Sequence, residues 1–158
     1  MNVFESLIAE FAQMSGLPLS PDERGGCFLE TDGIFITIQY REAAGDVAIF
    51  APVTDPEAAE RPSKAMLEKA LSLAYDGKGT AGASLGLFEG ELILSVHLPM
   101  QGLDAEGLGA KLLAFADAAV SAKAEIAAAM ASDDGGEHGW DGNAADGDAV
   151  DSSRFLRV

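Results

Sequence analysis

The period at which apolar residues recur changes four times along this chain, and this pattern constrains the fold more than any other feature. The first segment has helical spacing from Val3 to Met14, followed by Gly16, where a helix-ending glycine belongs, and by Pro18. A period of two residues then replaces it, and both periods occur once more before a last helical stretch. The sequence therefore predicts the order α-β-β-β-α-β-β-α, an α+β protein with helices packed on an antiparallel twisted sheet.

The strand-rich block has a clear turn and two distinct faces. Thr31-Asp32-Gly33 separates two β-prone runs within residues 27–40, and Asp-Gly between such runs is a strong hairpin signal. A further turn leads into residues 47–53, which completes a three-stranded meander. We expect the face of Ile36 and Ile49 to form the core, because polar residues interleave the phenylalanines of the other face.

The second half repeats the pattern with a longer final helix. A helix is expected from Pro62 to about Tyr75, and two strands follow around Glu89-Gly90. The last helix begins near Asp104, a good N-cap residue. Its apolar stripe consists of Leu108, Leu112, Phe115, Ala119, Ala122, Ile126 and Met130.

Composition bounds the partners and the compartment. The net charge of −16, from 26 acidic and 10 basic residues, argues against nucleic acid and anionic membranes as partners. The single cysteine, Cys27, allows no internal disulfide, and the start of the chain lacks the basic residues of a secretory signal. No apolar run reaches the ~20 residues of a membrane span. These features favour a cytoplasmic protein.

The composition changes after Ser132. Residues 132–158 are rich in Gly and Asp with few apolar residues, except for the closing "RFLRV". We expect one domain over residues 1–131 and a disordered acidic tail over 132–158.

The glycines of "AYDGKGTAGASLG" match the G-x-G-x-x-G of a dinucleotide loop at Gly77, Gly79 and Gly82. A dinucleotide loop requires a strand before the glycines and a helix after them, whereas here a helix comes first and a strand follows. We therefore expect a helix end and a loose turn rather than a nucleotide site.

No other pattern indicates chemistry. The two histidines, His97 and His138, lie far apart, and the acidic residues of the tail fit a calcium loop poorly. Cys27 shares a strand face with Leu29, which is typical of a packed thiol. No metal, no cofactor and no catalytic residue is predicted.

Four segments occur in an order and spacing that is typical of one protein family. They are "VFESLIAEFAQMSGLPL", "DERGGCFLETDGIFITIQY", "ALSLAYDGKGTAGASLGLFEGELILSVHLPM" and "LDAEGLGAKLLAFADAA". Together, over residues 1 to about 130, they resemble the class I type III secretion chaperones, the Tir-chaperone (CesT) family. The tail departs from that pattern.

The resemblance implies a cytoplasmic homodimer that is not an enzyme and uses no ATP. Such a chaperone binds the N-terminal segment of a secreted effector and keeps it stable and export-competent, and the export-apparatus ATPase is a further candidate partner. The alternative is a chaperone-like dimeric interaction module unrelated to secretion. A small enzyme is a third reading, without any residue cluster to support it.

The resemblance also implies two sets of site residues. The second helix and the following strand usually form the dimer in this family, and some of their residues can equally belong to the protomer core; the positions here are Met66, Leu67, Leu71, Leu73, Leu85 and Leu87. Effector contacts involve the first helix and the sheet, with candidates Phe4, Leu17, Leu19, Phe28, Phe35 and Phe50. For the tail, a solvating role and docking of "SSRFLRV" on a groove of the chaperone both remain open.

Overall fold

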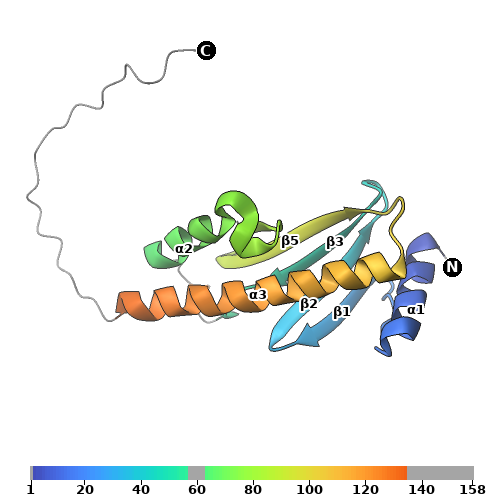
Figure 1. Cartoon of the computed structure of the whole chain (residues 1–158), viewed down its shortest axis with the longest axis horizontal. Helices are drawn as coiled ribbons and strands as arrows, with labels where there is room; N and C mark the ends of the chain where they lie inside the picture. The colour runs from blue at the N-terminus through green and yellow to red at the C-terminus, as the bar shows by residue number, and fades with distance from the viewer. Residues whose placement is uncertain (1, 57–62, 135–158) are drawn as a thin grey trace, which may run out of the picture.

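The computed structural model describes residues 2–56 and 63–134 (Figure 1). The predicted helix start at Pro62 and residues 135–158 of the tail lie outside this range. The regular elements are α1 (Val3–Ser15), β1 (Gly26–Thr31), β2 (Ile34–Arg41), β3 (Asp46–Pro52), α2 (Lys64–Ala74), the 3-10 helix η2 (Tyr75–Thr80), β4 (Ser84–Phe88), β5 (Glu91–Pro99) and α3 (Ala105–Asp134). The predicted order of helices and strands is confirmed, with η2 as an addition.

The strands form one antiparallel five-stranded sheet in the order β1-β2-β3-β5-β4. The long helix α3 runs across one face of this sheet, with α1 near its beginning and α2 near its end (Figure 1). The inner face carries Ile36, Ile38 and Ile49, each at most 1% exposed. The isoleucine face is therefore the core face, as predicted.

Two hairpins have tight two-residue turns whose residues adopt the left-handed backbone conformation. Asp32 and Gly33 (φ 49° and 72°) join β1 to β2, and Glu89 and Gly90 (φ 50° and 85°) join β4 to β5. Positive φ at both central residues matches the right-handed twist of the flanking strands. The Asp-Gly signal thus fixes the register that pairs Glu30 with Phe35.

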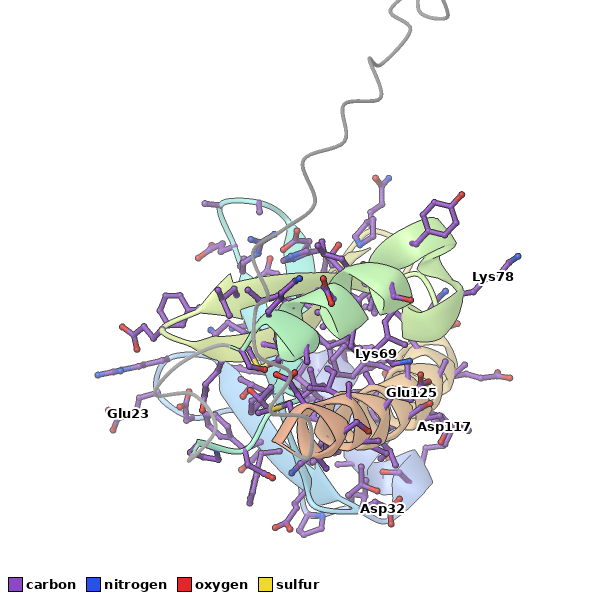
Figure 2. The ribbon with its side chains drawn as sticks, turned by 90° about the vertical axis from the view of Figure 1, so that its left-hand side faces the viewer. Glu23, Asp32, Lys69, Lys78, Asp117 and Glu125 are labelled. Atoms are coloured by element: carbon purple, nitrogen blue, oxygen red, sulfur yellow. The ribbon has the colours of Figure 1, made fainter. Side chains whose placement is uncertain are left out.

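The long helix begins and packs as its sequence indicates. The Asp104 side chain accepts a hydrogen bond from Gly107 N at 2.7 Å, which satisfies one free amide of the first turn. Glycine at position 109 admits α1, because a Cβ there would lie 3.2 Å from the Phe11 ring. Further along, Lys69 of α2 and Glu125 of α3 point toward each other and form a 2.7 Å ion pair (Figure 2).

The glycine stretch after α2 is more ordered than the predicted loose turn. It forms the 3-10 helix η2, and β4 begins at Ser84 instead of near Thr80. Ala81 has a φ of 51°, which is incompatible with a strand at that position. Gly79 lies so close to α2 that a Cβ would be 2.8 Å from the carbonyl oxygen of Leu73. The glycine therefore serves chain packing.

The free edge of β1 is closed at its beginning by an aspartate. Asp22 accepts hydrogen bonds from Gly26 N and Arg24 N at 2.8 and 2.9 Å, and its own amide donates to Gly26 O. In an antiparallel strand every second residue directs its backbone groups to the same edge. The backbone groups of Phe28 and Glu30 are therefore directed outward, beyond the part of the edge that Asp22 covers.

Candidate protein-binding surfaces

The outer face of the sheet lies opposite the helices of the described chain (Figure 1), and two exposed phenylalanines lie on this face. Phe28 of β1 and Phe35 of β2 are 64% and 63% exposed. Strand alternation causes this, since their neighbours Leu29 and Ile36 turn toward the core. Large apolar side chains grouped on an open face are typical of a surface that binds another chain.

These phenylalanines line a shallow depression of about 270 Å³ that we call the β1–β2 groove. Its lining residues are Phe28, Leu29, Glu30, Phe35, Ile36 and Thr37. Glu30 is the charged residue among them, and no ion pair joins its carboxylate to another residue of the described chain. The groove is thus apolar with one negative charge.

The structure brings together half of the predicted effector-binding residues. Phe28 pairs with Thr37, and Thr37 pairs with Phe50, so Phe50 lies in the same row of the outer face and is half-buried. Leu17 is 44% exposed after α1, and Leu19 is partly buried against the core.

Phe4 is a core residue instead of a surface residue. It is 1% exposed, and its ring stacks on that of Tyr40 with centroids 5.4 Å apart. The reason is its place on the inward stripe of α1, together with Leu7, Ile8 and Phe11. We therefore leave Phe4 out of the candidate effector surface.

A second apolar groove lies between α2 and β4. Four of the predicted dimer residues line it, with Leu71 74% and Leu87 51% exposed. The full lining of this α2–β4 groove is Leu67, Ala70, Leu71, Ala74, Leu85, Gly86, Leu87 and Leu92. Met66 and Leu73, in contrast, are 0% and 6% exposed and belong to the protomer core, because they face α3 and the sheet.

A charged cluster lies at the end of the outer face away from the β1–β2 turn. Arg41 Nε donates to Asp46 Oδ1 at 2.7 Å across the β2–β3 hairpin. This hydrogen bond lowers the pKa of the Asp46 carboxyl below its ordinary value of 3.8. His97 Nδ1 lies 3.9 Å from Asp46 Oδ2. The β1–β2 groove, at the other end of the outer face, is thus separated from this charged cluster.

The described residues offer no arrangement for metal binding or thiol chemistry. Among residues 2–56 and 63–134, no three His, Cys, Asp or Glu side chains are grouped to hold a metal ion. Burial, and to a smaller extent the charge of Asp22, raises the pKa of the Cys27 thiol to about 11. The thiol therefore stays protonated at neutral pH and packs as an apolar group. Within the same ranges, no helix has the length and apolarity that spanning a bilayer requires.

Sequence reasoning did not single out three further residues that lie outside the linings of the two grooves. Phe88 is 66% exposed at the end of β4, and Tyr75 is 82% exposed at the end of α2. The alternation of Phe88 with Leu87 was a usable signal for the first. The cap that Asp22 forms on the edge of β1 had none, because it depends on the fold of residues 22–26.

Comparison with known proteins identifies the family. The sequence model of the Tir chaperone protein (CesT) family matches residues 6–123. No curated protein matches the chain at a significant level of sequence similarity.

Several solved structures share the fold. They include the HopA1-SchA chaperone-effector complex (18% identity, 77% of this chain and 93% of that chain covered, TM-score 0.62). The ExsC-ExsE complex is 23% identical, with 73% and 86% covered and a TM-score of 0.60. The ExoT-SpcS complex from Pseudomonas aeruginosa is 20% identical, with 75% and 97% covered and a TM-score of 0.56.

The chain belongs to the Tir chaperone protein (CesT) family. The predicted assignment to the type III secretion chaperones, which bind effectors, is confirmed at this level.

Proposed function

We propose that this chaperone binds the N-terminal segment of a type III secreted effector along the outer face of its sheet. The exposed pair Phe28 and Phe35 in the β1–β2 groove is the observation that carries the proposal. An effector segment in extended form places apolar side chains in the groove, with Phe50 as a further contact. Binding in this form keeps the segment unfolded and ready for export.

The edge of β1 adds backbone recognition to these side-chain contacts. The outward backbone groups of Phe28 and Glu30 can pair with an added strand, as in other cases of strand addition to a sheet. Both residues also line the groove. One extended segment can therefore satisfy the edge and fill the groove together.

The binding cycle in this proposal needs no ATP and no catalytic step. Release follows from the ordering cost that an unfolded segment pays on binding, which limits its affinity per unit of buried area. The site of action is the bacterial cytoplasm. There the export-apparatus ATPase receives the complex as a further partner.

The α2–β4 groove is, in this proposal, where two copies of the chain form a homodimer. Leu67, Leu71, Leu85 and Leu87 are its exposed or partly exposed apolar residues. A second copy would remove this apolar area from water, which is the main favourable term in stable homodimers. Dimerisation also doubles the number of effector grooves.

The test is a pull-down from the native bacterium under conditions of secretion, followed by limited proteolysis of the partner. We expect one abundant secreted protein that is protected near its N-terminus and lost from the Phe28→Ser/Phe35→Ser variant. The matched control is Leu113→Ser, because Leu113 is 67% exposed but lies on α3, on the helical side of the sheet. Equal capture by both variants would refute the assignment of the β1–β2 groove.

A further inference from the structure

The β1–β2 groove has a chemical complement within the same sequence. Arg154, Phe155, Leu156 and Arg157 place two adjacent apolar side chains between two positive charges. The groove combines exposed Phe28 and Phe35 with the carboxylate of Glu30. The apolar side chains of the segment therefore match the phenylalanines of the groove, and its positive charges match the carboxylate of Glu30.

The charge match is specific within this chain. Arg154 and Arg157 are the basic residues that follow Lys123, in a protein of net charge −16. Two other apolar depressions of the described residues fit less well. The α2–β4 groove has no charged lining residue, and the depression beside Val53 contains Asp55 already paired with Lys123 at 3.0 Å. Of these three depressions of the described chain, the β1–β2 groove is the one in which a carboxylate without an ion-pair partner meets an apolar site.

The segment can reach this groove from the end of α3. Lys123 of α3 donates a hydrogen bond to Gly33 O, at the turn between β1 and β2, at 3.4 Å. From there α3 continues for 11 residues to Asp134, about 16 Å along the helix. Residues 135–153 then number 19, which span at most about 65 Å in extended form. At full extension the connection is about four times the 16 Å by which α3 runs past the turn, so it is long enough to return to the groove.

We propose that residues 154–157 occupy the β1–β2 groove of their own chain until an effector displaces them. Phe155 packs against Phe28 and Phe35, and an arginine of the segment pairs with Glu30. The regulatory meaning of this contact rests on the proposed function of the groove, whereas the contact itself does not.

Amide NMR spectra of the full chain test the contact without an effector. The spectrum of the Phe155→Ser/Leu156→Ser variant should differ from that of the unchanged protein at residues 26–31 and 34–37. The matched control is Val150→Ser, which removes an apolar tail residue outside the segment and should leave those signals in place. Changes confined to residues 150–158, or changes at the α2–β4 groove instead, would overturn the proposal.

A mixed sample tests which chain supplies the segment. Isotope-labelled Phe155→Ser/Leu156→Ser protein is refolded with an excess of unlabelled, unchanged protein. We expect the labelled groove signals to remain at the positions of the variant. Their return to the positions of the unchanged protein would show that a second copy fills the groove, and would overturn the assignment to the same chain.

Effector titration then separates the contact from its regulatory role. Tethered ligands typically have effective concentrations of the order of mM, so a weakly bound segment should reduce effector affinity roughly 2- to 10-fold. The Phe155→Ser/Leu156→Ser variant should recover this factor. Unchanged affinity would refute displacement by the effector. Groove signals that respond to the variant, in a protein that binds no effector, would instead refute the proposed function and leave the contact established.

Discussion

Replacement of Phe28 by alanine should weaken effector binding without unfolding the protein. An aromatic side chain buries about 150–250 Å² when it is fully covered. Phe28 is 64% exposed, so a bound segment can cover roughly 130 Å² more of it. At about 25 cal/mol per Å² this area corresponds to at most about 3 kcal/mol of binding free energy. Because coverage is incomplete and alanine keeps its Cβ, we expect a loss of about 2 kcal/mol, or ~30-fold in Kd.

The assay is calorimetric titration of the chaperone with the N-terminal segment of the effector found by pull-down. Urea unfolding of Phe28→Ala should give a midpoint close to that of the unchanged protein, because so exposed a side chain adds little to the core. Leu113→Ala is the control for the loss of an equally exposed apolar residue, at 67%, and should keep the original Kd. A Phe28→Ala affinity within about twofold of the original would refute the placement of the effector on this face.

Three further predictions concern the dimer, the turn after α2 and the charged hairpin. Leu71→Asp/Leu87→Asp should convert a dimer to a monomer in sedimentation velocity, and a persisting dimer would contradict the role of the α2–β4 groove. Gly79→Ala should lower the free energy of unfolding by about 1–3 kcal/mol in urea titration, because the added Cβ would meet the Leu73 backbone. Gly86→Ala is the control and should leave it unchanged, because no atom lies within 4 Å of a Cβ added there. Because the pKa of Asp46 is lowered in the folded protein, its ion pair with Arg41 stabilises the fold at any pH above 3.8, the ordinary pKa of the carboxyl group. This contribution is lost as the pH falls through the lower pKa of the folded state. Asp46→Asn should therefore be less stable near neutral pH and lack this part of the acid dependence in unfolding curves; identical pH profiles would show that the pair contributes nothing.

The order of elements could be predicted because it depends on local signals. Asp32-Gly33 sets the first hairpin, and Asp104 marks the start of α3, each through chemistry confined to a few residues. The apolar stripe of α3 was also correct, with Leu108 and Ala119 fully buried. The position of β5 between β3 and β4 has no local signal, since it depends on the return of the chain after α2.

The candidate surfaces could be predicted only in part, since helical periodicity identifies an apolar stripe but not its width. Leu71 and Leu73 were both assigned to the dimer surface, yet they point about 200° apart around α2, and the first is 74% exposed and the second 6%. The side of α2 that packs against α3 and the core is set by tertiary contacts, which a single sequence does not encode locally. Phe4 was likewise assigned to a surface because no residue of the first helix indicates its partner. The ring on which it stacks, that of Tyr40, belongs to β2.

The aspartate at the edge of β1 limits how much of a partner chain can be read through its backbone. Asp22 already holds both backbone groups of Gly26, so an added strand finds unoccupied groups only at Phe28 and Glu30. So few free backbone groups limit the pairing of β1 with a strand of another sheet. In the proposed binding mode, most of the recognition therefore depends on side chains in the shallow β1–β2 groove, where many sequences of similar apolar content would fit. A chaperone that binds in this mode would accept changes in its cargo sequence that would break a longer strand pairing.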